Sequence, residues 1–134
     1  MKKTFEDLLE IDGVVAQLYT KEPTLKESKF GYAYNRFHAK NYAPTVKEFQ
    51  EALTYARIDN ALEDEKTKAL LTDEKNTRGY QFSKEGLKNC IKAENKIIEE
   101  FYKKEIEIIP FFSPFIPEGI TETQIETLKG CVLE

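Results

Sequence analysis

The residues best suited to binding chemistry lie in one predicted helical row. Lys29, Tyr32, Arg36 and Lys40 recur at i, i+3, i+7 and i+11, which places them on one side of a helix. An Arg guanidinium binds phosphate or carboxylate through a planar fork of N–H donors. A Tyr ring can stack on a planar ligand. The row therefore predicts a surface that recognises an anionic group next to a ring.

Arginine is scarce in this chain, since Arg36, Arg57 and Arg78 are its only three. Arg78 stands before Gly79 at the end of a polar stretch, where its side chain and free backbone N–H groups could bind a phosphate. The alternative is that Arg36 and Arg57 pair with acids on neighbouring helices. The candidate ligand-binding residues are Tyr32, Arg36, His38 and Arg78.

No catalytic constellation accompanies these residues. His38 is the only histidine, and no nucleophile signature surrounds any serine or cysteine. Cys90 and Cys131 are too isolated for a redox pair or a zinc site, so both are expected to be buried thiols. Asp59 and Glu63 share a helix face but lack the Glu-x-x-His pattern of carboxylate metal sites. We therefore expect no enzyme activity, no catalytic residue, no metal and no cofactor.

An aromatic segment near the C-terminus is the second feature that could bind a partner. Its prolines, Pro110, Pro114 and Pro117, forbid a regular helix or a central strand. Two uses stay open: the aromatic side chains close the core, or they dock on a protein partner. The candidate interface residues are Phe111, Phe112, Phe115 and Ile116.

The elements that carry these residues are mainly helical. Thr or Ser caps and apolar residues at helical spacing predict helices at about 4–20, 24–40, 45–71 and 84–103, with a short one from 121. Short strands are expected at 80–82 and 105–109, paired in parallel or mixed fashion. The predicted fold is a single mainly α domain, residues 1–134. It has a long antiparallel helix pair, flanking short helices, a minor two-stranded β element and a Pro/Phe-rich arm at 110–118.

The charge distribution limits the classes of binding partner that we expect. The net charge of −4 conceals two +3 segments, 21–42 and 76–104, and a −5 segment, 105–134. Such polarisation favours protein contacts or self-association. The acidic balance argues against nucleic acid. The longest apolar stretch, 106–116, is too short to span a membrane. No apolar run follows Lys2 and Lys3, so no secretory signal is expected and the predicted location is the cytoplasm.

The order of these segments resembles a known group. A helix with Lys-Phe-Gly-Tyr-Ala-Tyr-Asn-Arg is followed by Pro44, a long helix, Gly-Tyr-Gln-Phe and a helix ending in Lys-Glu-Ile-Glu-Ile. Over residues 25–109 this resembles small uncharacterised helical accessory proteins of tailed bacteriophages. The resemblance implies a phage origin, with a virion accessory role or a host-interaction role, and a place in the host cytoplasm or the virion.

Two functions are compatible with these features. The first is a non-enzymatic, phage-encoded binding or assembly protein that acts through protein–protein contacts, as a homo-oligomer. The second is a small-ligand binder that sequesters an anionic nucleotide-like signal and so counters host defence.

Overall fold

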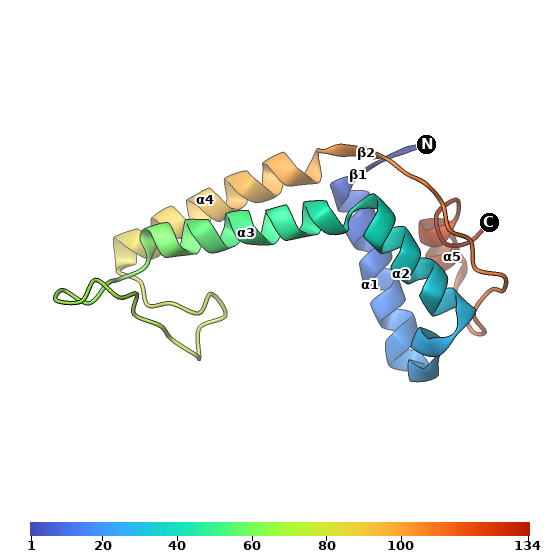
Figure 1. The fold of residues 1–134 in the computed structure, drawn as a ribbon, viewed down its shortest axis with the longest axis horizontal. Coiled ribbons are helices and arrows are strands. Elements are labelled where there is room, and N and C mark those ends of the chain that lie inside the picture. Colours follow the sequence, from blue (N-terminus) through green and yellow to red (C-terminus); the bar gives the residue numbers. More distant parts are fainter. The chain divides into compact units, whose positions relative to one another are not determined.

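The computed structural model describes all 134 residues and divides them into two compact units where the sequence predicts one domain. Unit 1 comprises Met1–Thr45 and Tyr102–Glu134, and unit 2 comprises Val46–Phe101. The fold is mainly α, as predicted, with five α-helices and a small antiparallel sheet (Figure 1).

Helix α1, Phe5–Lys21, is the first helix of unit 1 and lies where the sequence predicts a helix. The Thr4 side chain accepts a hydrogen bond from the Asp7 N–H, and the Asp7 carboxylate accepts one from the Thr4 N–H. This capping box satisfies two backbone donors that have no partner within the helix. One face of α1 is buried in the core, at the three- and four-residue spacing of a helix, through Phe5, Leu8, Ile11, Val15 and Leu18.

Helix α2, Lys29–Asn41, begins later than the sequence predicts. The predicted start at Thr24 is wrong, because a 3₁₀ helix, η1 (Pro23–Glu27), occupies these residues. Pro23 is suited to the start of such a turn. The N-cap of α2 is Ser28, whose hydroxyl accepts a hydrogen bond from the Gly31 N–H at 3.4 Å. Ser28 therefore separates η1 from α2, two helices that the sequence predicts as one.

The sheet joins the two stretches of unit 1. Strand β1, Lys2–Thr4, pairs antiparallel with β2, Glu105–Glu107, with Lys3 opposite Ile106. A strand near 105–109 was predicted, but the predicted partner at 80–82 is wrong, because Tyr80 forms only an isolated bridge with Thr72. The last helix, α5, Glu122–Leu128, has the predicted capping box between Thr121 and Gln124.

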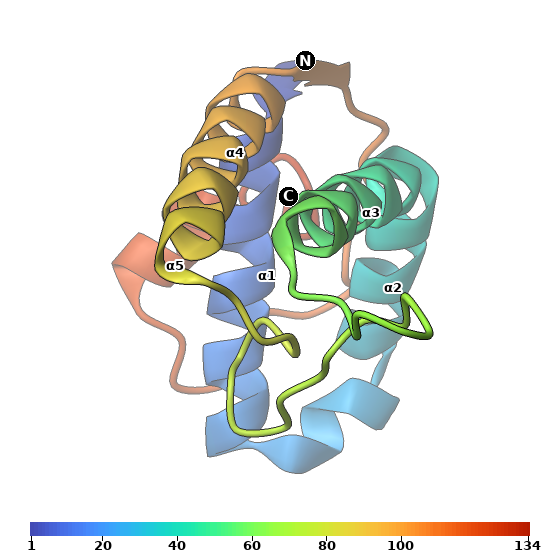
Figure 2. The same ribbon diagram turned by 90° about the vertical axis from the view of Figure 1, so that its left-hand side faces the viewer.

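Unit 2 is an antiparallel helix pair. Its first helix is α3, Ala43–Asn60, which belongs to unit 2 from Val46 onward. Its second is α4, Lys84–Tyr102, which belongs to unit 2 up to Phe101. The rings of Phe49 and Phe101 lie 5.3 Å apart, while Arg57 contacts Glu94 nearer the other ends of the two helices. Ser83 caps α4 as predicted by accepting a hydrogen bond from the Gly86 N–H. Figure 2 shows residues 61–83, green to yellow, linking the ends of α3 and α4.

The predicted extension of the third helix to Leu71 is wrong, since α3 ends at Asn60. Residues 63–68, Glu-Asp-Glu-Lys-Thr-Lys, include no hydrophobic side chain for packing, and propensity alone does not hold a helix in water. Three stretches of the 61–83 loop instead bond to one another. Leu62 N–H donates to the Gln81 carbonyl, Leu71 N–H to the Leu62 carbonyl, and Gln81 N–H to the Leu71 carbonyl.

Candidate functional site

The predicted cationic row forms one wall of a groove in unit 1. The opposite wall is the start of the Pro/Phe-rich arm, and the space between them is about 430 Å³. Of the predicted row, Lys40 lies outside the groove. The groove is lined by Lys29, Tyr32, Ala33, Arg36, Pro110, Phe111 and Phe112.

Arg36 lies at the centre of this arrangement. Its guanidinium carbon is 4.8 Å from the centre of the Phe111 ring, a cation–π contact. The side chain is exposed, and neither Arg36 nor Lys29 forms an ion pair with an acid of the chain. The alternative that Arg36 bridges an acid on another helix is therefore wrong. No hydrogen bond or ion pair within the chain engages its N–H donors, so they can bind an incoming anion.

The arm is held in place by backbone and side-chain hydrogen bonds. Phe111 N–H donates to the Cys131 carbonyl at 2.9 Å. Asn41, the last residue of α2, makes two bonds with Ile109: its Oδ1 accepts from the Ile109 N–H at 2.7 Å, and its Nδ2 donates to the Ile109 carbonyl at 2.8 Å. Asn41 thus joins the two walls. Sequence reasoning missed it, because its partner lies 68 positions away.

Exposed apolar side chains line the groove and continue along the arm. Tyr32 is 64% exposed on the α2 wall, and Phe112 is 44% exposed on the arm. Farther along the arm, Phe115 and Ile116 are 42% and 61% exposed. Of the four predicted interface residues, only Phe111 is half-buried, beneath Arg36. Aromatic residues and arginine are the types enriched in protein interfaces, so the groove and its rim have the composition of a binding surface.

His38 does not line the groove. Its ring lies against Tyr42, with centroids 4.7 Å apart, and near Tyr34 at 6.0 Å. The hydroxyl groups of both tyrosines donate hydrogen bonds to Asp12 Oδ1, which ties α2 and the residue after it to α1. His38 is therefore part of a packed polar cluster between these elements, and the predicted ligand-binding role has no support from its position.

This cluster predicts a loss of stability in alkali. Burial, with the hydrogen bonds to Asp12 next in size, raises the pKa of Tyr34 and Tyr42 above the ordinary value near 10. The unfolded chain therefore releases these protons at a lower pH than the folded chain does. We expect the contribution of these two tyrosines to the free energy of unfolding to have its full value below about pH 10. It should fall as the pH rises further.

Urea unfolding between about pH 8 and 11 measures this effect. Tyr34→Phe should lower the free energy of unfolding at the lower pH by about 1 kcal/mol and should flatten its decline with pH. Tyr55→Phe, at a tyrosine that is 61% exposed, is the matched control and should keep the wild-type profile. Equal slopes for the wild type and Tyr34→Phe would contradict the assignment.

Arg78 lies in unit 2, where its guanidinium contacts an acid. Its Nη2 is 2.8 Å from Glu94 Oε1, and Arg57 Nε is 2.8 Å from Glu94 Oε2. Glu94 is only 6% exposed. Burial disfavours its charged form, but the hydrogen bonds from Arg78 and Arg57 outweigh this and lower its pKa. Arg57 thus pairs with an acid, as the alternative expected. Arg78 also pairs with Glu94, through its Nε and Nη2.

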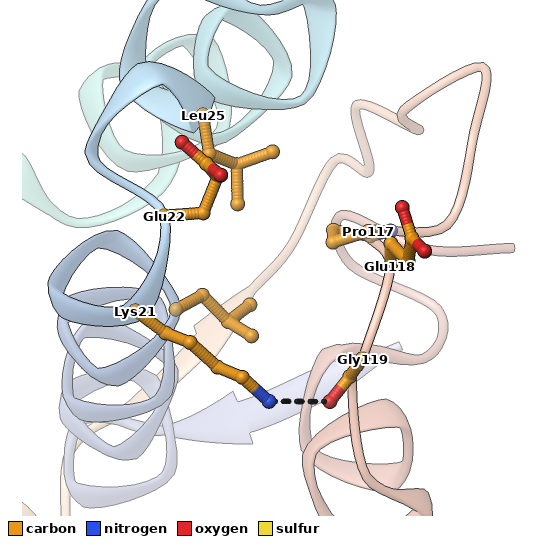
Figure 3. Close-up of a pocket in the computed structure, with 7 residues that line it drawn as sticks. Lys21, Glu22, Leu25, Pro117, Glu118 and Gly119 are labelled. Atoms are coloured by element: carbon orange, nitrogen blue, oxygen red, sulfur yellow. Dashed lines mark hydrogen bonds between the residues drawn. The ribbon is translucent and has the colours of Figure 1, made fainter.

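A second hollow in unit 1 was not signalled by the sequence. It measures about 310 Å³ and lies between the end of α1 and the 117–119 turn. Lys21 Nζ donates a hydrogen bond to the Gly119 carbonyl at 3.3 Å across it, as Figure 3 shows. The carboxylate of Glu22, on its edge, already accepts hydrogen bonds from Thr24. Because Lys21 and Glu22 already form hydrogen bonds within the chain, this hollow is a weaker candidate than the groove.

Further properties bear on the chemistry available to the chain. Both cysteines are fully buried, as expected. No three His, Cys, Asp or Glu side chains form a group that could hold a metal ion. None of the helices combines the length and apolar character needed to cross a membrane.

Comparisons of this chain with protein-family models, with characterised proteins and with solved structures found no match.

Proposed function

We propose that this protein is a non-enzymatic binding protein that acts through protein–protein contacts. Its groove would hold an acidic segment of a partner that also carries apolar side chains. The observation that supports this most directly is Arg36, exposed, unpaired and fixed over Phe111. Lys29 adds a second positive charge, while Tyr32 and Phe112 supply exposed rings on the two walls. The sequence resemblance to phage accessory proteins is the basis for proposing a virion accessory or host-interaction role.

A second candidate function is binding of an anionic, ring-bearing small molecule such as a nucleotide. The size of the groove favours it, since small-molecule sites occupy roughly 300–1,000 Å³ and this one measures about 430 Å³. Such a ligand would place its anion on Lys29 and Arg36 and its ring against Tyr32. His38 and Arg78 would take no part, because both are engaged elsewhere.

Fluorescence anisotropy with labelled probes separates the two candidates. The probes are a peptide of alternating Glu and Phe, the same peptide with Lys in place of Glu, and a labelled adenine nucleotide. We expect the acidic peptide to bind and the basic peptide to fail. Arg36→Glu should weaken binding at least tenfold, a loss of about 1.4 kcal/mol.

Lys40→Glu is the matched control, because it makes a similar charge change on the same helix outside the groove. It should weaken acidic-peptide binding far less than Arg36→Glu does. Binding of the nucleotide alone, lost in Arg36→Glu, would favour the second candidate. Failure of all probes, or equal losses in both variants, would refute a role for the groove.

A further inference from the structure

Helix α4 carries a row of lysines that the groove does not explain. Lys84, Lys88, Lys92 and Lys96 recur every four residues. All four are exposed, and none forms an ion pair with an acid of the chain. Residues four apart lie side by side on a helix. The row is therefore a continuous positive ridge on the outer surface of unit 2.

This ridge is unfavourable for an isolated helix. Like charges at i and i+4 destabilise a helix, and the row contains three such pairs. Lys84 is also the first residue of α4, where the helix dipole disfavours a positive charge. An anionic surface against the row would offset both costs.

Helix α3 carries a row of matching spacing and opposite charge. Glu51, Tyr55 and Asp59 also recur every four residues, and all three are exposed. Tyr55, in the middle, is 61% exposed. Asp59 stands next to the last residue of α3, where the dipole disfavours a negative charge. Neither acid forms an ion pair, and the nearest lysine along the row is Lys47, four residues before Glu51.

We propose that unit 2 binds a second copy of itself through these two rows. Glu51, Tyr55 and Asp59 of one copy contact the lysine ridge of the other. The acids lie eight residues apart, as do Lys88 and Lys96, so each pair is separated by about 12 Å of helix rise. Both acids can therefore meet a lysine at once.

The residues in the middle of the two rows can also contact each other. Tyr55 then faces Lys92, where an ammonium over a tyrosine ring adds a cation–π contact. Ile91, 38% exposed and one turn from Lys88, supplies apolar area beside the ridge. Two such rows align when the helices cross at about −50°, a common packing angle.

The contact joins two different faces, so a pair of copies keeps a free lysine ridge on one copy and a free acidic row on the other. A contact of this type continues from copy to copy and gives a closed ring or an open chain. It involves unit 2 alone and goes beyond the proposed function, which rests on a groove in unit 1. Because it depends on exposed charges, self-association should weaken as salt rises.

Sedimentation velocity of the full chain tests the proposal, over a range of protein concentrations at about 0.05 M and about 0.5 M salt. We expect the wild type to associate with concentration at low salt, and at least tenfold more weakly at high salt. Two charge-reversed variants, Glu51→Lys with Asp59→Lys and Lys88→Glu with Lys96→Glu, should each remain monomeric. An equimolar mixture of the two should associate again, because each contact then regains opposite charges. One chain carrying all four changes should do the same.

The matched control is Lys66→Glu with Lys75→Glu, two exposed lysines in the 61–83 loop whose reversal changes the net charge equally. It should associate as the wild type does, and circular dichroism should show the same helix content in every variant. A wild type that stays monomeric, reversed variants that still associate, or a mixture that stays monomeric would each overturn the proposal. A monomer whose ridge binds a labelled polyphosphate, with that binding lost in Lys88→Glu with Lys96→Glu, would point to a polyanion instead.

Discussion

Glu94→Ala is expected to lower the free energy of unfolding by about 3 kcal/mol, because removal of one partner of a buried ion pair leaves the other charges uncompensated. Here two guanidinium groups lose their acceptor at once, and each is less than one-third exposed. Arg78 also lies in the loop that joins the two helices, so its release should free the end of that loop from α4. Chemical denaturation followed by circular dichroism measures the first effect, and hydrogen exchange near Gly79 and Tyr80 measures the second.

Two comparisons sharpen this prediction. Glu100→Ala, at an exposed position on the same helix, should change stability by less than about 0.5 kcal/mol. Glu94→Gln retains an acceptor oxygen and should fall between Glu94→Ala and the wild type. If Glu94→Ala unfolds at the same denaturant concentration as Glu100→Ala, the ion-pair cluster does not stabilise unit 2.

Gly31→Ala is expected to destabilise unit 1 by about 2–3 kcal/mol, at the upper end of the cost of forcing extra atoms into a packed core. A Cβ at this position would lie 2.2 Å from the Lys26 carbonyl oxygen and 2.9 Å from that of Leu25. Both are backbone atoms of η1, which cannot turn aside as a side chain can. The first turn of α2 would have to move away from η1 and carry Lys29 and Tyr32 of the groove with it.

Gly13→Ala is the matched control for this change. Gly13 is exposed in α1, and no atom apart from its chain neighbours and the nearby backbone of its own helix lies within 4 Å of the position that its Cβ would occupy. Because glycine is a poor helix former, the alanine should stabilise the protein by about 0.5–1 kcal/mol. The two changes, chemically identical, should thus shift the denaturation midpoint in opposite directions. A shift in the same direction would show that contact with η1 is not the deciding factor.

The sequence predicted the features whose interacting residues lie close together along the chain. The capping boxes at Thr4 and Thr121 and the apolar face of α1 were found because their partners lie within four residues. The cationic wall of the groove was predicted for the same reason. The early end of α3 at Asn60 was not, since helical spacing continues past it. An amide side chain that can bond to its own helix, as Asn60 does with the Ala56 carbonyl, was the available signal.

Features that join distant residues could not be predicted in this way. No pattern near Asn41 indicates that it will bond to Ile109, and nothing near Arg36 indicates the Phe111 ring. Glu94 did carry a signal, because it lies seven residues after Leu87 on the apolar face of α4. An acid in that row needs a cation to accompany it into the interior, and a chain with three arginines offers few choices.

The division of unit 1 into two stretches, with all of unit 2 between them, has a consequence for the timing of folding. Contacts between neighbouring segments form quickly, whereas those between distant segments wait for a long loop to close. The helix pair of unit 2 is made of consecutive segments and can form as soon as it is synthesised. The β1–β2 pairing and the groove each need residues from both stretches. The groove can therefore form only after Phe111 and Phe112 have been synthesised, and the helix pair of unit 2 has by then been available for folding.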